Sequence, residues 1–395
     1  HRTYFGSSNP NFPPSQSSGF APLSQSMFGG SVFSSGGKPV AAEKDYERGC
    51  DGEVHVIICA LDYKGTSCEL TCTMDGDNMK KLLTDCGVRD VTTLYDNQCT
   101  KENVEQAIRQ VGGRCEENDY FFFYYSGHGS NLPDLDGDEE DGQDEALCLV
   151  GPNGELAGKY FMRDDDFAEI VSESIGSEVR AIIMSDCCHS GSIGDLSKEC
   201  WGDHQVITLS GCKDSQTSGD MGKGGIFTHS LLLALEKLTK SGDQDYSVAA
   251  VYNASLMEDD RVFDSAQDIM LQCTPGLTPA GMAWPLVPST GFRSPLTQAT
   301  NAVAQSIGAS VEDHDSDDED AAHATSANIH DAINNNPQQL EQFGVSSALL
   351  QGLMSDQGVN FSEILKHKED YMGQIQQLGS MCGTGLKKGA GCTVM

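Results

Sequence analysis

Short, strongly apolar runs alternate with helix-like segments through the middle of the chain, between residues 50 and 288. The runs are rich in β-branched and aromatic residues, as strands buried on both faces are. We expect strands at Val54–Leu61, Val91–Tyr95, Tyr120–Ser126, Ala181–Asp186 and Val206–Ser210, and helices at Asp75–Cys86, Lys101–Val111, Asp164–Ser174 and Phe227–Leu238. This alternation predicts an α/β fold, with a mainly parallel sheet and helices on both of its faces.

The segments on either side of this α/β region differ from it in composition. Residues 1–48 are rich in Ser, Gly and Pro and show neither the strand nor the helix period. This composition predicts a disordered N-terminal arm. Residues 290–395 contain the acidic run Glu312–Asp320, followed by weak helical patterning. We therefore expect an acidic, partly helical C-terminal extension.

The charge of the chain narrows the range of partners. It has 59 acidic and 25 basic residues, a formal net charge of −34. This balance argues against nucleic acid as a partner and favours basic peptides or metal ions. No apolar run approaches the roughly 18 residues that span a bilayer. Fifteen cysteines without paired CxxC spacing favour reduced thiols, so we expect a cytoplasmic protein. We also expect a monomer.

Two of the expected strands end in reactive residues. The strand Tyr120–Ser126 runs into His128, and the strand Ala181–Asp186 runs into Cys187 and Cys188. Catalytic groups gather beyond the carboxyl ends of strands in open parallel sheets. A Cys and a His at neighbouring strand ends predict a nucleophile and its base, because imidazole favours the reactive thiolate. The alternative is a buried structural Cys and a His that only caps a strand end.

These residues belong to two motifs that carry a family resemblance. YYSGHG at 124–129 is followed about 60 residues later by DCCHSG at 186–191, and the pair resembles the metacaspases, caspase-fold cysteine peptidases of plants, fungi and protists. The resemblance covers roughly residues 54–288 and includes ITLSGCKDSQTSGD at 207–220, which is similar to the start of the small-subunit region. It implies a type I-like arrangement, with a large-subunit-like part at 50–200 and a small-subunit-like part at 205–288.

The resemblance assigns roles to individual residues. It implies that His128 is the base and that Cys188 is the nucleophile, while Cys187 points the other way by the two-residue strand period. The family cleaves after Arg or Lys. Its pocket positions match Cys72, Asp75, Ser126 and Asp186. Thr71 replaces the Gly that usually precedes the pocket Cys, and this side chain could narrow the approach.

The resemblance also implies a metal site. Metacaspases that need calcium bind it with four aspartates, and the matching positions are Asp144, Asp164, Asp165 and Asp195. Calcium prefers such oxygen ligands and would fix the loop after Cys188. The acidic loop at 134–145 has EF-hand-like spacing, but Glu139 stands where that motif requires Gly. The alternative is a solvated acidic loop.

The C-terminus matches a lipidation motif. The last four residues, Cys-Thr-Val-Met, fit the C-a-a-X pattern and predict prenylation of Cys392. A single prenyl chain gives weak, reversible membrane association, so part of the protein would lie at a membrane. The alternative is an unmodified tail.

Together these features predict a calcium-dependent cysteine endopeptidase that cuts basic protein or peptide substrates after Arg or Lys. Such an enzyme should also process itself, and the candidate positions are Lys38, Lys44, Arg48 and Lys198. One alternative is a catalytically weak, calcium-binding scaffold that keeps the caspase fold. Another is an acidic calcium buffer that needs no folded site.

Overall fold

The computed structural model describes residues 31–306, except positions 48, 136, 138–141, 215, 217, 220, 221, 243 and 264. In this part of the chain, a seven-stranded sheet has the strand order β1-β10-β9-β8-β4-β2-β3. Five consecutive strands of this sheet are parallel: β2 (Val54–Ala60), β3 (Asp90–Tyr95), β4 (Tyr120–Ser126), β8 (Arg180–Asp186) and β9 (Gln205–Ser210). The predicted mainly parallel α/β fold is therefore confirmed.

Two antiparallel strands that the sequence did not reveal extend the sheet at one edge. β10 (Met270–Cys273) pairs with β9, and β1 (Phe33–Gly36) pairs with β10. The prediction of a disordered arm over residues 1–48 was wrong for β1. This strand has the sequence FSSG, which does not alternate apolar and polar residues, and none of its four residues is buried. Backbone hydrogen bonds to the sheet edge hold it instead.

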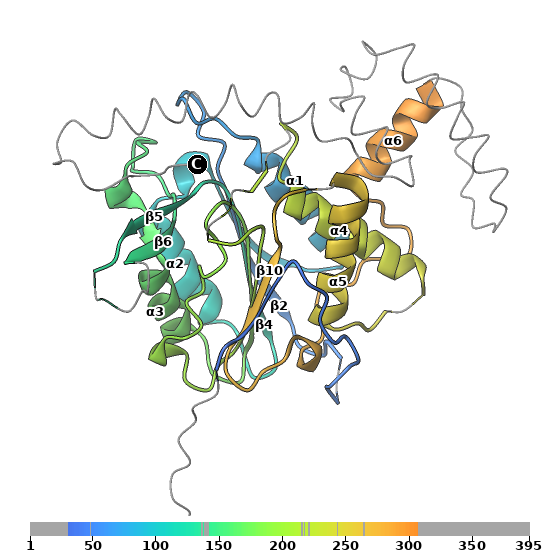
Figure 1. Cartoon of the computed structure of the whole chain (residues 1–395), viewed down its shortest axis with the longest axis horizontal. Helices are drawn as coiled ribbons and strands as arrows, with labels where there is room; N and C mark the ends of the chain where they lie inside the picture. Colours follow the sequence, from blue (N-terminus) through green and yellow to red (C-terminus); the bar gives the residue numbers. More distant parts are fainter. Residues whose placement is uncertain are drawn as a thin grey trace, which may run out of the picture. The chain divides into compact units, whose positions relative to one another are not determined.

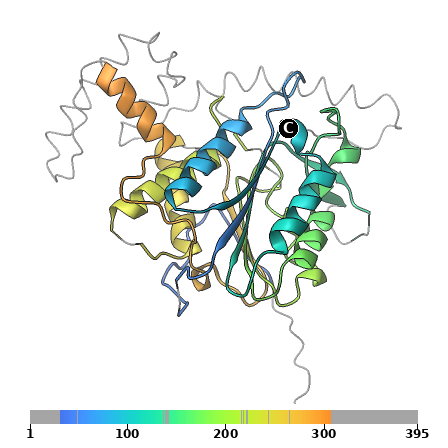
Figure 2. The ribbon, with the colours of Figure 1, turned by 180° about the vertical axis from the view of Figure 1, so that it is seen from behind.

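Helices cover both faces of the sheet (Figure 1). α2 (Lys101–Gly112) and α3 (Asp164–Ser174) lie on one face. α1 (Cys72–Asp85), α4 (Ile226–Lys240) and α5 (Val248–Glu258) lie on the other. Seen from behind, α1 and α2 lie on opposite sides of the central strands (Figure 2). Four of these helices match the predicted ones to within a few residues, and α5 was not predicted.

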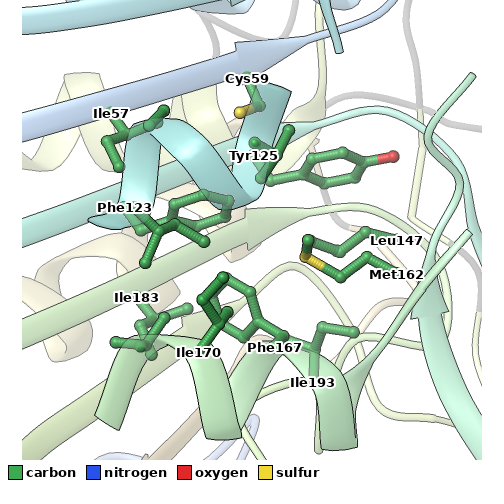
Figure 3. Close-up of a cluster of buried hydrophobic side chains, with 14 of the residues drawn as sticks. Ile57, Cys59, Phe123, Tyr125, Leu147, Met162, Phe167, Ile170, Ile183 and Ile193 are labelled. Carbon is green, nitrogen blue, oxygen red and sulfur yellow. The ribbon is translucent and has the colours of Figure 1, made fainter. Parts of the chain in front are cut away.

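Alternate side chains of each central strand enter two different hydrophobic clusters. In β4, the odd-numbered residues from Phe121 to Tyr125 face α2 and α3, and the even-numbered residues face α1, α4 and α5. Figure 3 shows the first cluster, where Phe123 packs against Phe167 of α3 with 4.8 Å between ring centroids. Burial on both faces explains why the strand reads as a continuous apolar run.

A small antiparallel sheet begins directly after His128. It consists of β5 (Gly129–Pro133), β6 (Gln143–Leu147) and β7 (Met162–Arg163). The sequence analysis did not predict it. Its importance is positional, because β6 contains Asp144 and β7 leads directly into α3 at Asp164.

The folded unit continues past residue 288, where the sequence suggested that the domain ends. α6 (Pro295–Ser306) contacts α4. The backbone N–H of Ser294 and the hydroxyl of Thr297 both donate to the buried carboxylate of Glu236, at 2.9 and 2.8 Å. The acidic run at 312–320 and Cys392 lie outside the described residues.

Among the helices of residues 31–306 that the structure describes, none combines the length and apolar character that crossing a lipid bilayer requires.

Candidate active site

The pairing of β4 with β8 brings the two reactive segments together. Ser126 and Asp186, the last residues of these strands, are register partners. His128 and Cys188 each follow two residues beyond this pair. At Gly129 a side chain would collide with the carbonyl oxygen of Cys188, so the two segments touch through their backbones. The two strand ends therefore form one site.

A backbone carbonyl orients the imidazole of His128. The Nε2 atom lies 2.8 Å from the carbonyl oxygen of Cys68. A carbonyl oxygen can only accept a hydrogen bond, so Nε2 carries the hydrogen. In the neutral imidazole the lone pair is then on Nδ1, which makes Nδ1 the basic nitrogen. Sequence reasoning missed this contact, because a backbone acceptor has no side-chain signature.

Two tyrosines fix the backbone of His128. Tyr63 Oη accepts the N–H of His128 at 2.9 Å and lies 2.9 Å from the carbonyl oxygen of Cys148, to which it donates. Tyr125 Oη donates to the carbonyl oxygen of His128 at 2.7 Å. The Tyr63 ring also packs against the imidazole, with 4.6 Å between centroids. Burial raises the pKa of both phenols well above its ordinary value, so both stay protonated near neutral pH.

Backbone strain is concentrated around the site. Five non-glycine residues in the described part of the chain have positive φ, and three of them lie here: Tyr63 (52°), His189 (50°) and Asp195 (36°). Such conformations cost about 1–3 kcal/mol each and persist only where surrounding contacts enforce them. The strain at Tyr63 is one reason that its contact with His128 was not foreseen from sequence.

Of the two adjacent cysteines, Cys188 has the environment of a nucleophile. Its sulfur accepts the backbone N–H of Ser218 at 3.2 Å, a contact that favours the thiolate. Cys187 instead lies in the hydrophobic cluster beneath α2 and α3. Burial raises the pKa of the Cys187 thiol well above its ordinary value, which makes that thiol unreactive.

The four predicted pocket residues lie together. Cys72 and Asp75 are in the first turn of α1, and Ser126 and Asp186 end neighbouring strands. The hydroxyl of Ser126 donates to Asp75 at 2.9 Å. Ser218 connects the pocket to Cys188, because its hydroxyl donates to Asp186 at 2.8 Å while its N–H contacts the sulfur of Cys188.

Neutral groups donate hydrogen bonds to both pocket carboxylates, which are almost fully buried. Asp186 accepts the N–H and the hydroxyl of Thr228, at 2.9 and 2.7 Å, at the N-terminus of α4. The partial positive charge of a helix N-terminus favours a carboxylate there. Burial raises the pKa of Tyr124 well above its ordinary value, and the negative charges of Asp75 and Asp186 add to the shift. The two charges therefore act in the same small region.

A backbone segment, Lys223–Gly225, lies over Asp75. The N–H of Gly225 donates to both oxygens of Asp75, at 2.9 and 3.1 Å, and the N–H of Gly224 donates to the hydroxyl of Thr71 at 2.9 Å. We expected Thr71 only to narrow the approach to the pocket. The structure shows that it also anchors this segment.

Asp62 is a further residue that sequence reasoning missed. Its carboxylate accepts the N–H and the hydroxyl of Thr73, each at 2.7 Å, and so fixes the first turn of α1 that carries the pocket residues. Burial alone would raise the pKa of Asp62, but hydrogen bonds from Lys64 and Thr73 outweigh it and lower this pKa. The sequence offered little indication of this role, because Asp62 lies ten residues before α1 begins, too far for an ordinary helix cap.

Three of the four predicted calcium ligands form a cluster. Carboxylate oxygens of Asp144, Asp164 and Asp165 lie within 4.8 Å of one another. Asp195 is not part of this group of three, but the ammonium of Lys198 connects it to them by pairing with both Asp165 and Asp195. Several carboxylate oxygens around one point are the donor set that calcium takes, so the residues fit that ion.

Comparisons with known proteins identify the family of this chain. Residues 53–258, just over half of the chain, match the family model of the caspase domain. The chain belongs to the caspase-domain family.

Its curated relatives include metacaspases, which confirms the resemblance seen in the sequence. Metacaspase-1 of Cryptococcus neoformans is 31% identical over 202 residues, covering 49% of this chain and 41% of that protein. Metacaspase-3 of Arabidopsis thaliana is 30% identical over 201 residues, covering 42% and 54%. The chain thus spans only about half, or less, of the length of the curated relatives it matches. A solved structure, caspase-1 of Spodoptera frugiperda, aligns with a TM-score of 0.42 at 13% identity, covering 65% of this chain and 98% of that one.

We predict that replacing Cys188 by Ala in this caspase domain lowers the hydrolysis of fluorogenic peptides by several orders of magnitude, because the attacking sulfur is lost. Cys187→Ala is the matched control and should keep most of the activity, since its thiol faces the core. An inactive Cys187→Ala beside an active Cys188→Ala would reverse the assignment.

We also predict that Tyr63→Phe lowers kcat about tenfold with little change in KM, because loss of the hydroxyl loosens the backbone of His128. Tyr252→Phe is the control: it removes a buried hydroxyl that donates to Ile269 at 3.0 Å, in contact with neither catalytic residue. Both variants should melt a few degrees lower. Equal kcat values for the two variants would show that Tyr63 has only a structural role.

Proposed function

We propose that this caspase domain is a calcium-dependent cysteine endopeptidase that cleaves after Arg or Lys. The observation that carries the proposal is the pair of buried carboxylates, Asp75 and Asp186, connected through Ser218 to the sulfur of Cys188. Both carboxylates accept hydrogen bonds from neutral groups, so their negative charge is not cancelled by these contacts. A substrate guanidinium or ammonium would supply the balancing positive charge, whereas a substrate carboxylate would be repelled.

Entry of a basic side chain requires an exchange of partners. The N–H of Gly225 now donates to Asp75, and Gly224 is anchored on Thr71. An incoming cation would replace the N–H of Gly225 with a hydrogen bond in which donor and acceptor are both charged. Entry of Arg or Lys therefore requires displacement of the segment Lys223–Gly225.

The dyad would then work in two stages. The sulfur of Cys188 attacks the carbonyl carbon while Nδ1 of His128 accepts the thiol proton and passes it to the leaving amine. Water, deprotonated by the same nitrogen, attacks the resulting thioester and releases the new carboxyl end of the peptide. The carbonyl oxygen of Cys68 accepts the Nε2 hydrogen and orients the imidazole through both stages.

Calcium would act through the loop that follows Cys188. When bound, the ion supplies two positive charges to the aspartate cluster. A chain of hydrogen bonds leads from this cluster to the loop: Glu145 N–H donates to Asp164 at 3.1 Å, and the hydroxyl of Ser192 donates to Glu145 at 2.5 Å. Ser192 N–H also donates to Asp214 at 2.9 Å. Ordering of the cluster would therefore stabilise the loop next to the nucleophile.

Self-processing belongs to the same proposal. Of the candidate positions, Arg48 lies outside the described residues. Lys44 pairs with Asp245 at 3.3 Å, and Lys198 pairs with aspartates of the metal cluster. Both lysines would have to leave these ion pairs before they could enter an active site. We further propose a cytoplasmic monomer, with weak membrane association through a prenyl group on Cys392.

We predict that the full chain with millimolar calcium hydrolyses a peptide with Arg before the scissile bond and ignores the same peptide with Asp there. Asp75→Asn should lower kcat/KM for the Arg peptide at least about 30-fold, because the cation loses a desolvated partner. Asp85→Asn is the control, since it makes the same charge change at the opposite end of α1, where Asp85 accepts from Ser289. Cleavage after Asp at a rate similar to that after Arg would refute the proposed specificity.

We predict that Asp165→Asn raises the calcium concentration for half-maximal activity about tenfold or more, because a charged ligand is lost. Asp166→Asn, the neighbouring acid on the same helix, pairs with Lys101 and should leave that concentration unchanged. Excess chelator should abolish activity of the parent chain. Full activity in the chelator would show that the cluster is only an acidic surface.

A further inference from the structure

The ammonium of Lys198 lies among the predicted calcium ligands. It pairs with Asp165 and lies 3.3 Å from Oδ2 of Asp195. Only 24% of the Lys198 side chain is exposed, and that of Asp195 is 7% exposed. The lysine therefore forms a largely desolvated ion pair, in contrast to most surface lysines.

We infer that Lys198 is an internal cation that takes the place of calcium between Asp165 and Asp195 in the metal-free protein, and that calcium binds by displacing it. The inference rests on the calcium site of the proposed function. It adds that the chain supplies its own competitor for that site, and it identifies the residue.

Charge balance explains why a cation is needed there. Four carboxylates close together repel one another unless positive charge lies between them. Arg163 pairs with Asp144, and Lys198 pairs with Asp165 and Asp195, so cations of the chain itself lie against these acids. A divalent ion brings more positive charge among the carboxylates than a monovalent ammonium does, and it takes six to eight oxygen ligands.

Lys198, rather than Arg163, is the cation that can leave. The guanidinium of Arg163 also donates to the carbonyl oxygen of Pro133 at 2.9 Å, a contact that calcium would not replace. The Lys198 ammonium pairs with Asp165 and Asp195, which are predicted metal ligands. Its release therefore breaks contacts that calcium itself would replace.

The backbone around the lysine is anchored independently of the ion pair. Trp201 is almost fully buried, and its indole N–H contacts the carbonyl oxygens of Gly194 and Asp195, each at 3.0 Å. The N–H of Lys198 donates to the carbonyl oxygen of Asp195 at 3.1 Å. Displacement then requires only rotation of a flexible four-carbon side chain, while Asp195 keeps its position.

Competition of this kind raises the apparent Kd for calcium. The apparent Kd equals the intrinsic Kd divided by the fraction of molecules in which the lysine does not occupy the site. We would measure calcium binding by isothermal titration calorimetry on the full chain carrying Cys188→Ala, which removes self-cleavage. Lys198→Met should lower the Kd for calcium about 5- to 30-fold. Lys198→Arg keeps a cation and should bind calcium more weakly than Lys198→Met does.

Lys101→Met is the matched control for the loss of one positive charge. Lys101 pairs at 2.6 Å with Asp166, which belongs to the same acidic run at the start of α3 but is not a predicted ligand. Equal Kd values for Lys198→Met and Lys101→Met would overturn the inference and leave the calcium site standing. Absence of binding in every variant and in the parent would remove the calcium site, and the inference with it.

A second measurement follows the ammonium directly and needs no change at position 198. Lysine amines of the Cys188→Ala chain are acetylated briefly with acetic anhydride, with and without calcium, and quantified by mass spectrometry. Labelling of Lys198 should rise severalfold in saturating calcium, whereas labelling of Lys101 should stay constant. Calorimetrically detected binding without any rise at Lys198 would contradict displacement.

Discussion

The parallel pairing of β4 with β8 is the interaction on which the rest of the site depends. Ser126 and Asp186 are register partners at the strand ends, so the residues that follow them lie at one edge of the sheet. A slip of one residue would turn every side chain of a strand to the other face. It would place Cys187, in place of Cys188, at the site. The register of β4 against β8 therefore specifies which cysteine lies beside His128.

Much of this sheet could be predicted, because a strand covered on both faces reads as a continuous apolar run. The elements that were missed have other sources of stability. β1 depends on backbone pairing with β10, and the small sheet β5–β7 carries acidic and polar residues on strands of two to five residues. α5 is rich in Val and Ala, and so shows too little contrast between its faces. Contacts with segments distant in sequence stabilise these elements, so the local sequence pattern does not reveal where they form.

Only those parts of the site that consist of recognisable side chains could be predicted from the sequence. Motif residues such as His128 and Cys188 could be recognised, and the resemblance supplied roles for Asp75 and Asp186. The supporting contacts could not be found in this way. The acceptor for His128 is a backbone carbonyl at Cys68, and the position of Tyr63 depends on a positive φ that few sequences signal. Catalytic geometry is thus built largely by groups that look ordinary in sequence.

The two acidic sites of this domain satisfy their carboxylates in opposite ways. Asp75 and Asp186 are buried and accept hydrogen bonds from N–H groups and hydroxyls, which are neutral donors. The second cluster already contains Arg163 and Lys198. A monovalent ion gains little by exchanging with an ammonium already bound there, whereas a dication gains the difference in charge. In the proposed function, the same type of side chain would bind a basic side chain at one site and a divalent metal at the other, and the neighbouring groups would decide which.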